Sequence, residues 1–373
     1  MFHKNINYPF GLDISDLSLK AIQLNKRGEK IKIQAFNKIS LEQGIIENGE
    51  IKNQEKAIKA IKNLINKPKF GRFNLNEVVA CLPEPKTFIK LVKIDNSPNK
   101  IEDLIASEIE KHIPLEVNKM YYDWQIVSKT SDSQMVLVGA SPKYLVEQYL
   151  NTIEKAGLST IALEIEAQAI SRALIPKQQV TKPKKYGIID IGAKRSSMFI
   201  YANDAILFNV SIPISGQEIT KQIAKTLEIN EKQAELAKII CGLDETKAQG
   251  IIKKILSNMI KNLIERIERV LEFYENHYGS YGNLDEILLC GGGANIKDLN
   301  KIIEEKISLK VKLADAFINL NQVTSDFKDF TELHKLNTET FNAKKGKTIS
   351  LKQDSSLSYA TAIGLALREI LSK

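Results

Sequence analysis

Two short stretches of the sequence place an aspartate where an apolar run gives way to a polar turn. Residues 186–201 read YGIIDIGAKRSSMFIY, in which Asp190 follows the apolar run. Residues 10–24 read FGLDISDLSLKAIQL and repeat the arrangement around Asp13. Each stretch predicts a strand, a tight turn and a second strand. A carboxylate beside such a turn can be presented to one ligand together with free backbone N–H groups. The repeat predicts a duplicated fold with a ligand between its halves.

Three consecutive glycines form a third candidate element. Gly291–Gly293 follow the apolar run Ile287–Cys290 and precede a helical pattern over 297–307. Glycines let a ligand approach the backbone closely, and a helix N-terminus adds free N–H groups. Turns with hydroxyls and N–H groups suit phosphates, paired carboxylates suit Mg²⁺, and the glycine turn suits a base or ribose. We therefore predict an Mg-nucleotide in an interdomain cleft. The alternative, that Asp13 and Asp190 only cap their turns, stays open at this point.

Composition and charge narrow the class of protein. The 373 residues are 43% hydrophobic and 26% charged, which is ordinary for a globular protein of two or more domains. The net charge is +8, but the lysines are dispersed and are not interleaved with aromatic residues. This pattern predicts no nucleic-acid binding and favours a position beside an anionic membrane surface.

Several other classes are excluded by what the sequence lacks. Cys81, Cys241 and Cys290 are odd in number and far apart, which predicts buried thiols in a reducing compartment. The histidines form no ligand-spaced cluster, so we predict no structural zinc. There is no GxxxxGK[ST] or helix-opening GxGxxG, no signal peptide, and no apolar run of roughly 18 residues. We expect a cytoplasmic protein that is peripheral to the membrane rather than inserted.

The pattern of the chain predicts two lobes, each with an insertion. The first lobe is 1–185, with its core at 8–94 and 160–185 and a compact α+β insert at 95–160. The second lobe is 186–373, with its core at 186–215 and 285–373 and a helical subdomain at 216–284. Two further expectations are a helix over 161–174 that carries Glu164 and Glu166, and a polar surface insertion over 319–356.

In their order along the chain, these motifs resemble those of the actin-like ATPases. Residues 11–13 with Lys20, residues 190–193 and residues 289–294 are similar to the phosphate-1, phosphate-2 and adenosine motifs of that superfamily. Further segments resemble the branch that contains the type IV pilus assembly protein PilM and the cell-division protein FtsA: 44–51, 110–127, 164–174, 215–224, 234–242 and 362–369. The resemblance implies an α/β, ribonuclease H-like, duplicated two-lobe ATPase fold whose α+β insert is of the PilM/FtsA type.

The resemblance also implies a site for ATP and Mg²⁺. Asp13 and Asp190 would position the metal through water, and Glu235 and Lys238 would face the ribose. Glu164 and Glu166 are candidate catalytic residues, because they lie near where relatives orient water. The implied nucleotide-binding residues are Asp13, Ser15, Asp16, Leu17, Ser18, Lys20, Asp190, Gly192, Ala193, Lys194, Arg195, Gly216, Glu235, Lys238, Gly291, Gly292, Gly293 and Ile296.

The sequence departs from the family pattern at three places. Ser15 replaces a usual glycine, residues 194–196 (KRS) replace Gly or Thr, and Glu164 stands where Asp is common. The added positive charge predicts either tighter binding of a triphosphate or a changed geometry. The longer Glu164 side chain predicts slow hydrolysis at most, with the nucleotide acting as a structural and conformational ligand.

Three functions are compatible with the resemblance. The first is a cytoplasmic ATP-binding scaffold of a type IV pilus or type II secretion-like assembly platform at the inner membrane. It would bind the cytoplasmic N-terminal segment of a PilN-like membrane protein, and the assembly ATPase, the platform protein and self-association are further candidates. The second is an FtsA-like division filament, disfavoured because only two residues follow the closing helix. The third is a small-molecule kinase, disfavoured because the insert at 95–160 offers no evident general base.

Overall fold

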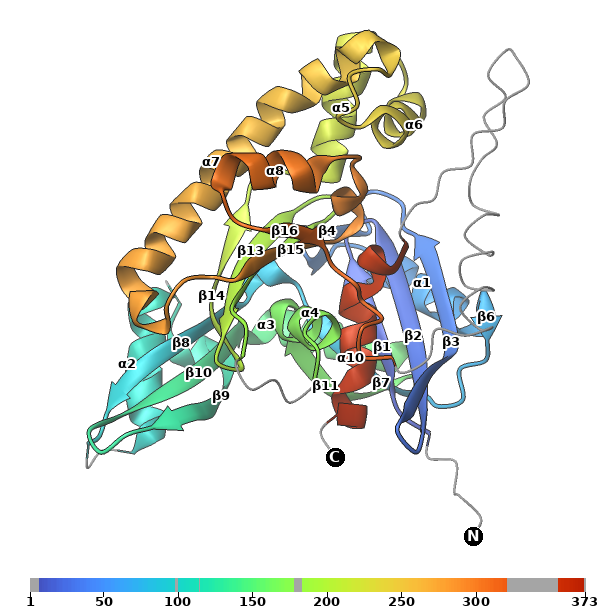
Figure 1. The fold of residues 1–373 in the computed structure, drawn as a ribbon. Coiled ribbons are helices and arrows are strands. Elements are labelled where there is room, and N and C mark those ends of the chain that lie inside the picture. The colour runs from blue at the N-terminus through green and yellow to red at the C-terminus, as the bar shows by residue number, and fades with distance from the viewer. Residues whose placement is uncertain (1–6, 98–99, 114, 178–182, 321–354, 372–373) are drawn as a thin grey trace.

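The computed structural model describes residues 7–97, 100–113, 115–177, 183–320 and 355–371, and it contains two large β-sheets (Figure 1). The sheet nearer the N-terminus has six strands, in the order β11-β7-β1-β2-β3-β6. These strands span Ser159–Ile165, Glu77–Leu82, Phe10–Ser15, Ser18–Arg27, Lys30–Ser40 and Phe70–Gly71, respectively.

The second sheet has eight strands, in the order β16-β15-β12-β13-β14-β8-β10-β9. The small pair β4 and β5 (Ile46–Glu47 and Glu50–Ile51) lies apart from both large sheets. The eight strands span Val311–Leu313, Glu286–Cys290, Tyr186–Ile191, Ser196–Ala202, Ala205–Ile212, Phe88–Asp95, Ser133–Pro142 and Met120–Lys129, respectively.

The two sheets repeat one topology, as the paired motifs predict. Each sheet contains three consecutive antiparallel strands, β1-β2-β3 in the first and β12-β13-β14 in the second. A later strand, β7 or β15, pairs parallel with the first of the three. Both sheets end in a further parallel strand, β11 and β16. The matching order confirms the duplicated α/β fold.

Helices cover the sheets and form the subdomain above the second lobe. Most of them carry an apolar stripe on one face, as in α1, where Ala57, Ile61 and Leu64 are buried. Side-chain caps fix several starts: Asn53 caps α1 and Ser215 caps α5. The α-helices are α1 Gln54–Asn66, α2 Ile101–His112, α3 Lys143–Lys155, α4 Glu166–Leu174, α5 Gly216–Leu227, α6 Glu231–Cys241, α7 Ile251–Tyr278, α8 Leu299–Ile307 and α10 Ala360–Leu371.

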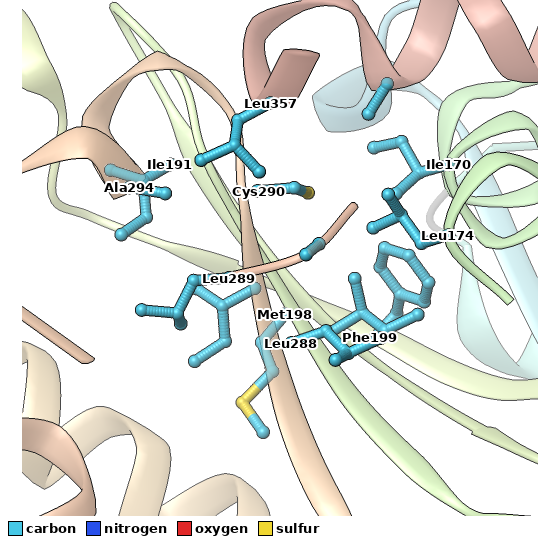
Figure 2. Packing of buried hydrophobic residues seen from close by; sticks show 14 of the residues in the cluster. Ile170, Leu174, Ile191, Met198, Phe199, Leu288, Leu289, Cys290, Ala294 and Leu357 are labelled. Atoms are coloured by element: carbon cyan, nitrogen blue, oxygen red, sulfur yellow. The ribbon is translucent and has the colours of Figure 1, made fainter. Parts of the chain in front are cut away.

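The main core joins the two lobes. Ile170 and Leu174 of α4 point toward residues of the second sheet, among them Phe199 and Leu288 (Figure 2). The opposite side of α4 packs on the first sheet, because Ala169 lies in a cluster with Val79, Cys81 and Leu365 of α10. The helices α4 and α10 therefore lie between the sheets and hold the lobes together through apolar contacts.

Two glycines allow α10 to lie directly on its neighbours. A Cβ on Gly364 would stand 1.7 Å from the carbonyl oxygen of Ala169, and one on Gly11 would stand 2.1 Å from that of Ala362. Backbone therefore meets backbone at α4, β1 and α10, and no side chain fits between them. The tight packing of the last helix agrees with its small residues.

The insert extends the second sheet rather than the first. Strand β8 pairs with β14 at Phe208 and Lys90, and it carries β10 and β9 beyond it. A separate apolar cluster, which includes Ile105, Ile109 and Val136, lies between these strands and α2. Helix α3 packs elsewhere, because its residues Leu145 and Tyr149 join the first-lobe cluster. We propose on this basis that the insert comprises β8, α2, β9 and β10, and that α3 belongs to the first lobe.

One predicted element is wrong and one cannot be compared. Residues 161–165 were predicted to begin a helix, but they belong to strand β11, and helix α4 begins only at Glu166. A short apolar run before a helix reads equally well as strand or helix, so periodicity alone does not separate the two. Most of the predicted surface insertion at 319–356 lies outside the described residues.

Candidate functional site

A polar cavity of about 160 Å³ lies between the two predicted phosphate turns. It contains five carboxylates and four basic side chains, a density of charge that is typical of a site for an ionic ligand. Its lining residues are Asp13, Ser15, Asp16, Leu17, Ser18, Lys20, Lys38, Glu84, Glu166, Asp190, Gly192, Ala193, Lys194, Arg195, Ser196, Ser197, Gly291, Gly292, Leu357, Ser358 and Thr361.

The turn between β1 and β2 presents a carboxylate that is already neutralised. Lys20 stands directly opposite Asp13 in the antiparallel register, and its Nζ donates to Asp13 Oδ2 at 2.5 Å. Ser15 Oγ donates to the other oxygen, Oδ1, at 2.7 Å. Burial alone would lower the pKa of Lys20, but the neighbouring Asp13 carboxylate raises it above its usual value. Lys20 is therefore a cation held in place at the floor of the cavity.

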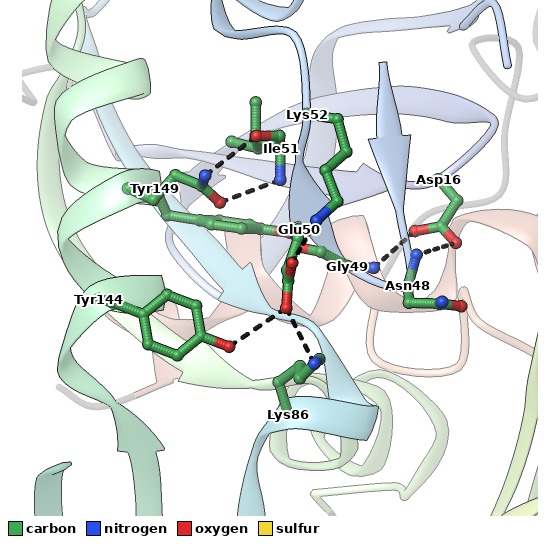
Figure 3. A network of polar contacts seen from close by, with 10 residues as sticks. Asp16, Asn48, Gly49, Glu50, Ile51, Lys52, Lys86, Tyr144 and Tyr149 are labelled. Carbon is green, nitrogen blue, oxygen red and sulfur yellow. Dashed lines mark hydrogen bonds and ion pairs between the residues drawn. The ribbon is translucent and has the colours of Figure 1, made fainter. Parts of the chain in front are cut away.

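Asp16, at the tip of the same turn, is fixed by backbone donors. Its oxygen atoms accept hydrogen bonds from the N–H groups of Asn48, at 3.2 Å, and of Gly49, at 2.9 Å (Figure 3). Gly49 has φ +78°, in the left-handed region that the turn between β4 and β5 requires. Asp16 thus joins the phosphate turn rigidly to the hairpin at 46–51.

The turn between β12 and β13 is equally tight but differs in charge. The N–H of Gly192 donates to the carbonyl oxygen of Arg195 at 2.8 Å, and a Cβ on Gly192 would stand 2.5 Å from that oxygen. Burial raises the pKa of Asp190 to about 6, although Lys20 acts in the opposite direction. Gly291 must be glycine, because it has φ +79° and its Cβ would stand 2.2 Å from Asp190 Oδ1.

Glu166 lies between the two aspartates at the start of α4. Burial and the negative charges of Asp190 and Asp13 together raise its pKa to about 8. Thr361 Oγ1 donates to Glu166 Oε1 at 3.2 Å. A carboxyl group that titrates near neutral pH can take up or release a proton in this cavity.

The predicted set of binding residues omits six polar residues of the cavity, namely Lys38, Glu84, Ser196, Ser197, Ser358 and Thr361. Glu84 closely follows the buried strand β7, just as Asp13 and Asp190 occupy strand ends, and this signal could have found it. Its carboxylate accepts from Asn209 Nδ2 at 2.9 Å, and burial raises its pKa. Lys38 faces Lys20 across β2 and β3, and burial together with Lys20 lowers its pKa to about 8.

The structure separates the two glutamates that were predicted together. Glu164 lies outside the phosphate cavity, on β11, where Arg172 donates to it at 2.7 and 2.8 Å and Arg368 at 2.9 Å. These three residues line a different cavity, which is described below. Glu164 belongs to strand β11 and Glu166 to the first turn of α4, so the change from strand to helix between them sends the two side chains to different cavities.

The residues predicted to hold the ribose and base form a second polar group beside the cavity. Lys238 Nζ donates to Glu235 at 2.7 Å and to the carbonyl oxygen of Gly216 at 2.9 Å. The N–H of Gly216 donates in turn to the carbonyl oxygen of Gly192 at 3.0 Å, which connects this group to the phosphate turn. Gly293 and Ile296 lie within and just after the short turn Gly292–Asn295, and Ile296 is buried.

The donor set suits a metal that is held mainly by ligand and water. Within the described residues, no group of three or more His, Cys, Asp or Glu side chains is arranged to hold a metal ion. Asp13 and Asp190 nevertheless supply oxygen donors on both sides of the cavity, and Mg²⁺ commonly combines one or two carboxylates with phosphates and waters.

A second cavity, of about 470 Å³, lies between the insert and the first lobe. The insert contributes the half-exposed ring of Tyr121, and β11 and α4 contribute Glu164, Gln168 and Arg172. Arg368 of α10 completes the ion-paired group. Strand β9 forms the outer edge of its sheet at this place. We call this cavity the insert groove.

Two duplicated sheets around a polar cleft define the class of this protein, because the same fold is found in the actin-like ATPases. The chain is similar over 88% of its length to the solved structure of MreB5 of Spiroplasma citri bound to AMPPNP, with 17% identity, 97% coverage of that chain and a TM-score of 0.50. A family model described as type IV pilus assembly protein PilM matches residues 11–370, so the chain belongs to that family.

Two further likenesses agree with this assignment. A solved structure described as a PilM-PilN type IV pilus biogenesis complex aligns with a TM-score of 0.78 and 19% identity, covering 97% of this chain and 98% of that chain. The cell division protein FtsA of Streptococcus pneumoniae is 23% identical over 198 residues, which are 48% of this chain. The match spans only 42% of that FtsA, less than half of its length. No helix in the described part of the chain is long and apolar enough to cross a membrane.

Proposed function

We propose that this protein is an ATP-binding scaffold of a type IV pilus assembly platform, stationed at the inner face of the cytoplasmic membrane. The observation that carries the proposal is the polar cavity between the duplicated turns in a chain of the PilM family. ATP, with Mg²⁺ between Asp13 and Asp190, is the proposed ligand. Its phosphates would lie against the turns at 15–18 and 192–195, and its base would lie toward Gly291–Gly293.

The nucleotide would act mainly by holding the lobes in one relative position. Glu166 is the acidic group that could orient or deprotonate water there, and Glu164 lies outside the cavity with two arginines. A ligand that contacts both lobes stabilises the arrangement in which both contacts are made, whether or not it is hydrolysed. We therefore expect slow turnover at most.

The proposed partner is the cytoplasmic N-terminal segment of a PilN-like membrane protein, and the proposed binding site is the insert groove. The similar solved structure is described as a PilM–PilN complex, which supports this class of partner. The groove offers aromatic surface, with Tyr121 47% exposed, and the uncovered edge of strand β9. These features suit an extended peptide that places apolar side chains on the aromatic rings. Self-association and contacts with the assembly ATPase or platform protein remain further proposals.

The experiment is to measure peptide binding and ATP turnover together. A fluorescently labelled peptide of the PilN-like segment is titrated with the full chain by anisotropy, with and without Mg-ATP. Tyr121→Ala is expected to weaken binding by about tenfold or more, because aromatic anchors dominate such interfaces. The control, Ile251→Ala, removes a residue of α7 that is 44% exposed and should not change binding.

The rate of ATP hydrolysis distinguishes a scaffold from an enzyme. The scaffold proposal requires tight ATP binding with hydrolysis near background in the presence and absence of the peptide. Fast turnover that depends on a small acceptor molecule would instead establish a kinase. Equal peptide binding by the wild type and Tyr121→Ala would remove the insert groove from the proposal.

A further inference from the structure

An ion pair joins the two phosphate turns across the cleft. Arg195, at the end of the second turn, donates through Nη2 to Asp16 Oδ1 of the first turn at 3.2 Å. The other terminal nitrogen of Arg195, Nη1, is buried and has no hydrogen-bond partner among the described residues. A buried donor without an acceptor is unfavourable, so the guanidinium group has capacity for a further acceptor.

Asp16 does not depend on Arg195 for its position. The N–H groups of Asn48 and Gly49 continue to hold both of its carboxylate oxygens if the arginine moves away. The side chain of Asp16 is 3% exposed, whereas that of Arg195 is 26% exposed. Asp16 is therefore a fixed acceptor, and the long arginine side chain is the member of the pair that can change position.

The location of the pair indicates which part of a nucleotide Arg195 would meet. In the proposed binding mode the base lies toward Gly291–Gly293, so the phosphates extend toward the turn of the first lobe at 15–18. Arg195 contacts the tip of that turn at Asp16 and so stands at the far end of the phosphate chain. A terminal phosphate there presents several oxygens at the spacing that a guanidinium group binds with two parallel hydrogen bonds.

We propose that Arg195 exchanges Asp16 for the terminal phosphate of a nucleoside triphosphate, and that this exchange lets the protein distinguish triphosphate from diphosphate. This inference rests on the proposed nucleotide site and deepens it. Without a terminal phosphate, Arg195 links the lobes through Asp16. With one, the arginine binds the ligand, and the lobes are linked through the phosphate.

The test compares two ligands in one variant. The full chain is titrated calorimetrically with Mg-AMPPNP and, separately, with Mg-ADP. Arg195→Ala is expected to weaken the binding of AMPPNP by about tenfold and the binding of ADP by less than about twofold. The reason is that the variant loses a charge-assisted contact that only the triphosphate makes. Arg195→Lys keeps the charge without the planar fork and should give an intermediate ratio.

Two controls separate the exchange from a general effect of charge. Lys194→Ala removes the same charge from the neighbouring position in the turn and should change both affinities by the same factor. Asp16→Asn removes the competing carboxylate charge and should raise the preference for AMPPNP over ADP. The Gly192–Arg195 hydrogen bond uses only backbone atoms, so the alanine variant keeps the turn, and its melting temperature checks this.

The results distinguish this inference from the proposed function. An AMPPNP-to-ADP affinity ratio that is the same in Arg195→Ala as in the wild type overturns the exchange and leaves the nucleotide site standing. A wild-type chain that binds neither ligand overturns the nucleotide site itself. A selective loss of AMPPNP in Arg195→Ala, without such a loss in Lys194→Ala, supports the exchange.

Discussion

The two phosphate turns share one backbone design but balance their charges differently. In the first lobe, Asp13 stands opposite Lys20 in the strand register, and the two form a buried ion pair at 2.5 Å. In the second lobe, the corresponding partner of Asp190 is Ser197, which brings no positive charge. The pKa of Asp190 is accordingly raised to about 6 by burial. The two lobes therefore share the hairpin backbone but differ in the charge that lies opposite the aspartate.

This difference assigns the turns different tasks. In the first turn, the carboxylates of Asp13 and Asp16 both accept hydrogen bonds from donors of the protein itself. This turn is therefore a rigid part of the cavity wall that needs no ligand to balance its charge. The second turn carries Asp190, whose negative charge is disfavoured by burial. A cation bound beside Asp190 would stabilise that charge. A metal ion that arrives with phosphates is such a cation. The second turn is therefore where ligand binding should have the larger electrostatic effect.

The largest expected effect comes from breaking the ion pair of the first turn. Asp13→Asn leaves Lys20 charged and buried without its partner, so we expect a loss of about 3 kcal/mol in the free energy of unfolding. Urea unfolding followed by circular dichroism measures it. Combining Asp13→Asn with Lys20→Met should recover much of the lost stability, because the unpaired ammonium group of Lys20 is then removed as well. A loss below about 1 kcal/mol in the single variant would show that the pair is solvated.

A smaller effect is expected at Glu166, between the turns. Its pKa is about 8 in the folded chain, against an ordinary value of 4.5. Between these pH values the folded state holds a proton that the unfolded state has lost, so stability falls as the pH rises from about 5 to about 8. Glu166→Gln removes this fall and should stabilise the nucleotide-free protein more at pH 8 than at pH 5. Melting temperatures across this range measure the difference, and parallel profiles would contradict the prediction.

The smallest effect on stability is expected at Asp190. Its folded pKa of about 6 exceeds the ordinary value of 3.8, so stability is lost as the pH rises through this interval. Asp190→Asn should therefore stabilise the nucleotide-free chain at pH 7, by less than Glu166→Gln does at pH 8, while weakening Mg-dependent AMPPNP binding. If Asp190→Asn instead destabilises the chain as much as Asp13→Asn does, the two turns do not differ as described.

The sequence predicts the elements of the fold well where patterns are strong and local. The hairpins around Asp13 and Asp190, the helix at 54–66 and the glycine turn are all recognisable from alternation, periodicity and punctuation. Strand β11 escapes because it runs directly into α4 without a Gly or Pro between them. The packing of α3 and α10 escapes for a different reason, since it joins segments that are distant in the sequence.

The candidate site shows the same limit. Asp13, Lys20 and Asp190 belong to motifs and reach the cavity as predicted. Thr361 reaches the cavity only because α10 packs against α4, which is distant in the sequence. Local sequence patterns do not predict such a contact. The contact between Arg195 and Asp16 likewise depends on how closely the lobes approach, which is set by the core between the sheets.

The contact of α10 with β1 also sets an order for the folding of the newly made chain. Gly11 in the first strand leaves room for the backbone at Ala362, near the other end of the sequence. A ribosome that adds roughly 5–20 residues per second needs tens of seconds to pass from one to the other. During that time, the first sheet lacks the helix that covers β1. The first lobe is begun first and finished last, so its completion waits until the second lobe has been synthesised.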